Sequence, residues 1–309
     1  MSLEKEKIMN YQKVLENIQR ELKDYVTKHN LKALVLGVSG GIDSALVAAI
    51  SAPVCKELGI PLIGRSITIT SSNKQEERDR ATAVGEAFCT DFKEVDLTNV
   101  FEVFSESIEG YEGTDSTEIS GRIRKGNLKS RLRMCFSYEL SHRYRGCVLG
   151  TDNKTESAGA PSNSGGGGLA FFSIGGDGTV DINPIGNLWK TEVYELSSYL
   201  LTTYIPKSNE YQSLESCIKG VPSDGLGVTP DGSDLSQIGK SSYAEVDRIL
   251  IRYHELCALR DSGIIRDNED IITEIYALEQ DVVIKRHLAG LFKALIPYSF
   301  HRDLITRDA

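Results

Sequence analysis

The sequence lacks several patterns that would assign it to a membrane, secreted or metal-cluster class. No uninterrupted apolar run approaches about 18 residues, and no basic segment followed by an apolar one opens the chain. The six cysteines include no C-x-x-C pair, so a zinc or iron–sulfur site has little support. We therefore expect a cytoplasmic protein whose thiols are reduced.

An excess of basic residues is also missing. Lys and Arg number 35 against 44 Asp and Glu, which gives a net charge of −9. Because nucleic-acid binding depends on clustered positive charge, this balance argues against general binding to nucleic acid. The 309 residues show no internal repeat and no second domain boundary, so we expect a single domain over residues 1–309.

Two familiar phosphate-binding patterns are absent, namely the Gly-Lys-Ser/Thr of a Walker A loop and the G-x-G-x-x-G of a dinucleotide fold. In their place stands KALVLGVSGGIDSALVAAI, residues 32–50. It reads as a short apolar strand, a turn of small residues and a buried helix. Backbone N–H groups and the helix dipole converge on an anion at such a junction. Gly40 and Gly41 let the backbone approach a phosphate closely.

One acidic residue decides what kind of phosphate loop this is. Asp43 would repel a phosphate unless a cation lay between them, so it indicates Mg²⁺. Glu156 is a second carboxylate, just beyond a later predicted strand. On loops at one edge of a sheet, these two acids are able to share one Mg²⁺ with the phosphates of ATP.

Apolar strands alternate with helical segments through the first half of the chain. After a helix over 4–29 and the strand at 33–38, strands are predicted at 61–70, 92–97 and 147–150, and helices at 74–89 and 126–145. This alternation predicts an α/β fold with a parallel, doubly wound sheet. Ligands bind such sheets beyond the carboxyl ends of the strands, which are expected at Ser39, Thr70, Asp96 and Thr151.

The second half is less regular. Residues 158–168, AGAPSNSGGGG, form either a lid over the site or a neutral surface insertion. A helix is predicted to begin at Lys190, a loop to run over 212–239, and a helix to span 243–260. Shorter helices follow as far as Pro297.

The SGGIDS loop resembles the pyrophosphate loop of the ATP pyrophosphatases. GNLKSRLRM, GTDNKTE, FFSIGGDGTVDINPIGNLWK and FKALIP then follow in the order found in ammonia-dependent NAD synthetases, from residue 31 to 297. The resemblance implies an adenine nucleotide alpha-hydrolase-like fold, with a mostly parallel sheet at about 31–205 and a helical C-terminal part at about 206–309. It also implies a homodimer with the substrate at its interface. The implied reaction amidates deamido-NAD to NAD with ammonia and ATP, through an adenylate.

The same resemblance implies roles for individual residues. Catalysis would rest on Lys190 and Asp43, and the metal ligands would be Asp43 and Glu156. The residues expected to contact ATP are Gly37, Val38, Ser39, Gly40, Gly41, Ile42, Asp43, Ser44, Arg133, Thr151, Lys190 and Ser223. Those expected to contact deamido-NAD are Arg131, Phe171, Ile174, Asp177, Asp181, Phe292 and Lys293.

Three positions depart from the family pattern. Ile174 and Phe292 stand where a Lys and a His are usual, and Asn153 replaces a His. Lys154 or Lys219 is a candidate substitute for the missing Lys. Two other functions therefore stay open: an ATP pyrophosphatase that modifies tRNA, and a nucleotide-binding sensor that has lost catalysis. Tight, salt-sensitive tRNA binding would favour the first, and ATP binding without pyrophosphate release the second.

Overall fold

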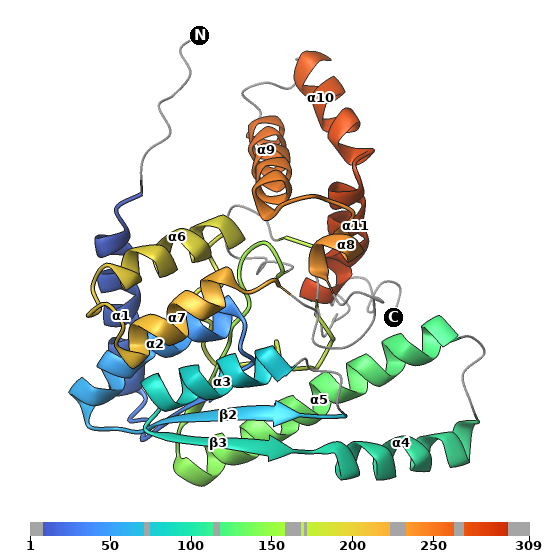
Figure 1. The fold of residues 1–309 in the computed structure, drawn as a ribbon. Helices are drawn as coiled ribbons and strands as arrows, with labels where there is room; N and C mark the ends of the chain where they lie inside the picture. Colours follow the sequence, from blue (N-terminus) through green and yellow to red (C-terminus); the bar gives the residue numbers. More distant parts are fainter. Residues whose placement is uncertain are drawn as a thin grey trace, which may run out of the picture.

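The computed structural model describes residues 9–70, 75–113, 118–157, 168–169, 172–222, 233–262 and 269–295 (Figure 1). Phe171, Ser223 and residues 158–167 of the glycine-rich segment lie outside these ranges, so the predictions made for them stay predictions.

Four parallel strands form the sheet that the rest of the chain surrounds. They are β1 (Leu34–Gly37), β2 (Leu62–Thr68), β3 (Asp91–Asp96) and β4 (Cys147–Leu149), in the order β3-β2-β1-β4. The central strand β1 is covered on both faces, which explains why it reads as an apolar run. The predicted α/β fold with a parallel sheet is confirmed.

Helices cover both faces of the sheet. Helices α2 (Ile42–Leu58) and α3 (Gln75–Phe88) pack on one face of the sheet, and α1 (Tyr11–Lys28), α6 (Lys190–Leu201) and α7 (Asn209–Lys219) pack over these two helices. Helix α5 (Glu118–Tyr144) packs on the other face, and α4 (Thr98–Glu112) packs against α5 beyond the end of β3 (Figure 1). The chain passes from β1 through β2 to β3 by way of α2 and α3, then returns along α4 and α5 to reach β4. This change of direction places a topological switch point between β1 and β4, where ligands of such folds bind.

The predicted elements differ from the structure in three places. The helix predicted over 4–29 begins only at Tyr11, because the Asn10 side chain caps it by accepting the Lys13 N–H. Helix α4 was not predicted, and α5 begins at Glu118 rather than at residue 126. The loop predicted over 212–239 is wrong, because α7 occupies its start and α8 (Asp234–Ile238) its end. The Ser208 side chain caps α7 by accepting from the Tyr211 N–H, and Leu214 on this helix is fully buried.

A second hydrophobic core holds the C-terminal helices together. These are α8, α9 (Tyr243–Asp261), α10 (Glu269–Glu279) and α11 (Val282–Gly290), and the 3₁₀ helix η1 (Leu291–Leu295) follows α11 and packs against it. Helix α9 packs against α6, so this group stands over the carboxyl edge of the sheet (Figure 1). Within the described ranges, no helix has both the length and the apolar character needed to cross a membrane.

Candidate active site

Hydrogen bonds to two serine side chains of the glycine-rich loop fix its conformation. The Ser39 N–H donates to Ser44 Oγ at 3.2 Å, and the Gly41 N–H donates to Ser39 Oγ at 3.2 Å. The Ser44 hydroxyl donates in turn to the Gly41 carbonyl at 3.1 Å. Gly41 is the N-cap of α2 and offers no side-chain cap, so the first turn of α2 keeps N–H groups available to an anion.

Gly40 is the point where the loop touches helix α3. Its φ is +83°, and a Cβ there would lie 2.2 Å from the Glu77 carbonyl oxygen. The Gly40 carbonyl accepts from Arg80 Nε at 3.0 Å and from Cys217 Sγ at 3.5 Å. A glycine is therefore required both by the backbone conformation and by the close approach of α3.

A buried lysine joins the two predicted metal ligands. Lys190 Nζ lies 2.5 Å from Asp43 Oδ2 and 2.8 Å from Glu156 Oε1, and the lysine is 2 % exposed. Asn153, fully buried, donates from Nδ2 to the other oxygen of Asp43 at 2.9 Å. Its Oδ1 accepts the Glu156 N–H at 3.1 Å. Asn153 thus connects both acids.

The charges of this cluster shift the pKa values of its members. Burial alone lowers the pKa of Lys190, but the adjacent Asp43 and Glu156 carboxylates raise it well above its ordinary value. Burial, together with the charges of Glu156, Asp177 and Asp43, raises the pKa of Asp152 to about 7. Lys190 therefore stays protonated and positively charged beside these acidic side chains.

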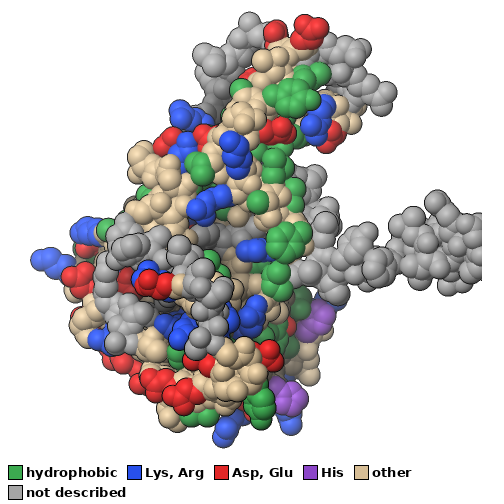
Figure 2. Space-filling view, turned by 90° about the vertical axis from the view of Figure 1, so that its right-hand side faces the viewer, with side chains coloured by type: hydrophobic (Ala, Val, Ile, Leu, Met, Phe, Trp, Pro, Cys, Tyr) green, Lys and Arg blue, Asp and Glu red, His purple; other side chains and the backbone are tan. Residues whose placement is uncertain are grey.

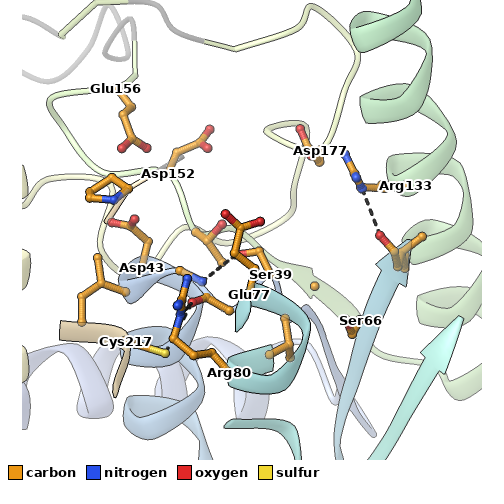
Figure 3. Close-up of a pocket in the computed structure, with 18 of the residues that line it drawn as sticks. Ser39, Asp43, Ser66, Glu77, Arg80, Arg133, Asp152, Glu156, Asp177 and Cys217 are labelled. Atoms are coloured by element: carbon orange, nitrogen blue, oxygen red, sulfur yellow. Dashed lines mark hydrogen bonds between the residues drawn. The ribbon is translucent and has the colours of Figure 1, made fainter. Parts of the chain in front are cut away.

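These groups line a cavity of about 310 Å³ at the switch point. In Figure 3, the carboxyl groups of Asp43, Asp152 and Glu156 lie on one side of the cavity, and Arg133 and Asp177 lie on the opposite side near α5. The cavity therefore has an acidic wall beside the glycine-rich loop and a mixed wall on α5.

The sequence profile of the NAD synthase family matches residues 14–289, which is most of the chain. The chain belongs to the NAD synthase family. It is 34% identical over 243 residues to an NH(3)-dependent NAD(+) synthetase of Methanosarcina mazei, covering 76% of this chain and 81% of the relative. Another such synthetase, of Archaeoglobus fulgidus, is 30% identical over 273 residues, covering 88% of this chain and 93% of the relative.

Solved structures share the fold of this NAD synthase chain. An NH3-dependent NAD synthetase of Campylobacter jejuni superposes with a TM-score of 0.63 at 25% identity, covering 95% of this chain and 100% of that structure. An NMN synthetase of Francisella tularensis superposes with a TM-score of 0.68 at 22% identity, covering 95% and 99%. At 22% identity, the similarity to the NMN synthetase shows a shared fold and nothing more.

Two cations predicted for the substrate side of the NAD synthase site are bound to the backbone of one segment. Arg131 Nε donates to the Ile174 carbonyl at 3.1 Å, and Lys293 Nζ donates to the Phe172 carbonyl at 2.8 Å. Phe292 is 59 % exposed. Residues 172–174 are therefore held from both α5 and η1.

The other predicted residues of this side divide into two groups. Asp177 accepts from Ser130 Oγ at 2.6 Å and lines the cavity. Asp181 accepts the Val148 N–H at 2.7 Å and is therefore tied to β4. Of the two lysines considered as substitutes, Lys154 lies over the Trp189 ring and Lys219 pairs with Glu215 on the surface. Neither lines the cavity.

Several residues that shape this NAD synthase site were not predicted from the sequence. Arg80 was one charge among many in the segment ERDR, and only the fold brings it to Gly40. Asp247 had a detectable signal, because it interrupts an apolar stripe of α9 between Val246 and Leu250. An acidic side chain in a buried stripe needs hydrogen-bond donors beside it. Asp247 accepts hydrogen bonds from the Thr155 hydroxyl and the Thr191 N–H.

Proposed function

We propose that this chain is an ammonia-dependent NAD synthetase, which uses ATP to amidate deamido-NAD to NAD. The observation that carries this proposal is the Lys190, Asp43 and Glu156 cluster beside a phosphate-binding loop at the switch point. It occurs in a chain that matches the NAD synthase family over residues 14–289. A synthetase of this kind must hold a triphosphate and a carboxylate in line, and the cavity offers both an anion-binding loop and cations.

The site residues are assigned roles that follow from their positions. The loop at 37–44 binds the phosphates of ATP through backbone N–H groups, and Thr151 lines the same cavity. Lys190 is the catalytic cation, which stabilises the charge that builds on the phosphate oxygens. Arg133 and Arg80, from opposite walls, add positive charge for the phosphates or for the acceptor.

Magnesium is proposed as the metal that accompanies ATP. Asp43 and Glu156 supply two carboxylates, and Mg²⁺ usually takes one or two carboxylates together with substrate phosphates and water. Among the described side chains, no group of three or more His, Cys, Asp or Glu is arranged to hold a metal without such help. The donor set therefore fits a metal that enters with the nucleotide. Mg²⁺ held by Asp43 and Glu156 would supply positive charge against the phosphates of ATP.

The chemistry proceeds in two displacements. The nicotinate carboxylate of deamido-NAD attacks the α-phosphorus of ATP, so a C–O–P linkage forms and pyrophosphate leaves with the P–O bonding pair. Free ammonia then attacks the acyl carbon, AMP leaves with the C–O bonding pair, and the ammonium nitrogen loses a proton to give the amide. No protein nucleophile is required, so catalysis consists of alignment and charge stabilisation.

The assembly is proposed to be a homodimer in the cytoplasm. Apolar side chains are exposed on α4 and α5, on one side of the molecule; they are Val100, Val103, Phe104, Tyr111 and Ile123. A second copy would remove this surface from water. All six cysteines are free thiols, as expected in a reducing compartment. On the face in Figure 2, acidic and basic side chains are interspersed, which gives no support to a nucleic-acid partner.

Pyrophosphate release tests the proposal directly. Purified protein is supplied with ATP, Mg²⁺ and ammonium chloride, with and without deamido-NAD, and NAD is followed by chromatography. We expect release that depends on deamido-NAD and matches the NAD formed, and loss of both in an Asp43→Asn variant. Nicotinic acid mononucleotide serves as the comparison acceptor. Stimulation by the mononucleotide alone would overturn deamido-NAD as the substrate, and absence of any acceptor-dependent release would overturn the reaction class.

A further inference from the structure

Helix α6 supplies an acceptor for its N-cap residue, because Glu192 Oε2 accepts the Trp189 N–H at 2.8 Å, but the N–H groups of Lys190 and Thr191 are bonded outside the helix. Its N-cap is Trp189, whose indole has no oxygen with which to accept an N–H from the first turn. The first four N–H groups of any α-helix need partners from outside the helix. The partners of these N–H groups matter for function in α6, because its first residue is Lys190.

The missing acceptors come from two distant residues. Thr155 Oγ1 accepts the Lys190 N–H at 2.8 Å, and Asp247 Oδ2, on α9, accepts the Thr191 N–H at 2.9 Å. The Thr155 hydroxyl is also bonded to Asp247 Oδ1 at 2.6 Å. Thr155 is fully buried and Asp247 is 2 % exposed. The start of α6 is therefore capped by the chain beside Glu156 and by a C-terminal helix.

The direction of each hydrogen bond is fixed by chemistry. An ionised carboxylate only accepts, so the Thr155 hydroxyl donates its proton to Asp247. This leaves the lone pairs of Thr155 Oγ1 for the Lys190 N–H. Asp247 thus orients the Thr155 hydroxyl and places a negative charge at the positive end of α6.

A second side chain of α9 reaches the same lysine. Tyr243 precedes Asp247 by one helical turn, and Lys190 Nζ lies 5.2 Å from the centroid of its ring. The Tyr243 hydroxyl donates to Asp234 Oδ2 at 3.1 Å, which fixes the ring. Helix α9 therefore contacts both ends of Lys190, its ammonium through Tyr243 and its backbone through the Thr155–Asp247 pair.

We propose that Asp247 is a positioning residue for Lys190, acting through Thr155 and the first turn of α6. Asp247 is not among the residues that line the cavity. Its carboxylate sets the backbone from which the Lys190 ammonium extends between Asp43 and Glu156. This inference rests on the proposed role of Lys190 in NAD synthesis.

Turnover of three variants tests the positioning role. Asp247→Asn keeps the shape but removes the negative charge and one of the two acceptors, so either the Thr191 N–H or the Thr155 hydroxyl loses its partner. We expect kcat to fall about 10- to 100-fold, as for other supporting residues, with little change in KM for ATP. Thr155→Val should lower kcat by a similar factor, whereas Thr155→Ser, which keeps the hydroxyl, should retain most of the activity. Asp261→Asn, the same change at the exposed end of α9, is the matched control.

Additivity separates positioning from general loss of stability. Asp247 and Thr155 act in one chain of hydrogen bonds, so the double variant Asp247→Asn/Thr155→Val should have nearly the kcat of the weaker single variant. Losses that multiply, or that disappear when folded protein is assayed well below its unfolding temperature, would overturn the inference.

Hydrogen exchange gives a readout that does not depend on the reaction. Overlapping peptides that cover residues 186–200 report protection of the Lys190 and Thr191 amides. In Asp247→Asn we expect exchange in this first turn to become faster, most of all at the Thr191 amide, while the middle of α6 keeps its protection. Unchanged protection at both amides, or loss spread over the whole of α6 and α9, would overturn the positioning role. If the wild type fails to convert deamido-NAD, the proposed function fails and this exchange result alone decides the inference.

Discussion

Replacement of Gly40 by alanine tests the requirement for glycine in the phosphate-binding loop. The new Cβ would lie 2.2 Å from the Glu77 carbonyl oxygen, whereas ordinary contacts begin at 3.4 Å. The loop and α3 would therefore have to separate by about 1.2 Å. This movement also pulls Arg80 from the Gly40 carbonyl that it now contacts.

The expected cost has two parts. A non-glycine residue at φ +83° costs about 1–2 kcal/mol, and overpacking adds about 1–3 kcal/mol, for a total of about 2–5 kcal/mol. Gly239→Ala is the matched control, because its φ is +81° but a Cβ there meets only Val282 Cγ1 at 3.8 Å. That variant should show the backbone cost alone.

Denaturant unfolding and pyrophosphate release measure the two consequences. Gly40→Ala should lose more unfolding free energy than Gly239→Ala, and a displacement of this size should lower kcat/KM for ATP by about 100-fold. Gly239→Ala should leave kcat/KM for ATP near the wild-type value. Equal stability of the two variants, together with unaltered use of ATP by Gly40→Ala, would refute the packing argument.

Three further changes have defined outcomes. Lys190→Ala leaves Asp43 and Glu156 without their shared cation, so pyrophosphate release should be lost and unfolding should become easier by about 3–5 kcal/mol; a fully active variant would remove Lys190 from the mechanism. Arg80→Ala should raise KM for ATP about 10-fold through loss of a charge-assisted contact, and steady-state kinetics with an effect on kcat alone would contradict that role. Burial lowers the pKa of His287 below its ordinary value near 6.5, against the bond to the Gly168 carbonyl. The unfolded chain then takes up the proton first, so stability should fall as pH falls from about 6.5 through the folded pKa. His287→Asn, which keeps a donor for that carbonyl, should lose less stability than the wild type when urea unfolding is compared at about pH 7.5 and about pH 5.5.

The sheet and its ligand-binding edge were predictable because local pattern and burial agree there. Apolar runs of strand length, each followed by small or acidic residues, correctly predicted β1 and β4 and therefore the edge where Asp43 and Glu156 meet. Helix α7 was missed although Tyr211, Leu214, Cys217 and Ile218 recur at helical spacing, because the short segment merges into a stretch rich in Gly, Ser and Asp that was interpreted as one loop.

The partners of the site residues were not predictable from local pattern. Arg80 meets Gly40 across 40 residues, and Asp247 meets Thr155 across 92. Such pairings depend on how α3 and α9 are placed by the two hydrophobic cores, and a linear sequence carries no periodic signal for them. The Asn153 bridge is similar, because the change from His became interpretable only with Asp43 beside it.

Helix α6 and its N-cap residue contribute side chains to both hydrophobic cores. This arrangement bears on whether heating first removes activity or first unfolds the sheet. Trp189 is buried with the C-terminal helices, whereas Val193 and Leu196, farther along α6, are buried with the helices that cover the sheet. Lys190 lies directly between these two sets of contacts. Loosening of α9–α11 alone would therefore free the start of α6 while the sheet stayed intact. We therefore expect activity to be lost on heating before the β-sheet signal in circular dichroism, and the C-terminal helices to limit the temperature at which the enzyme works.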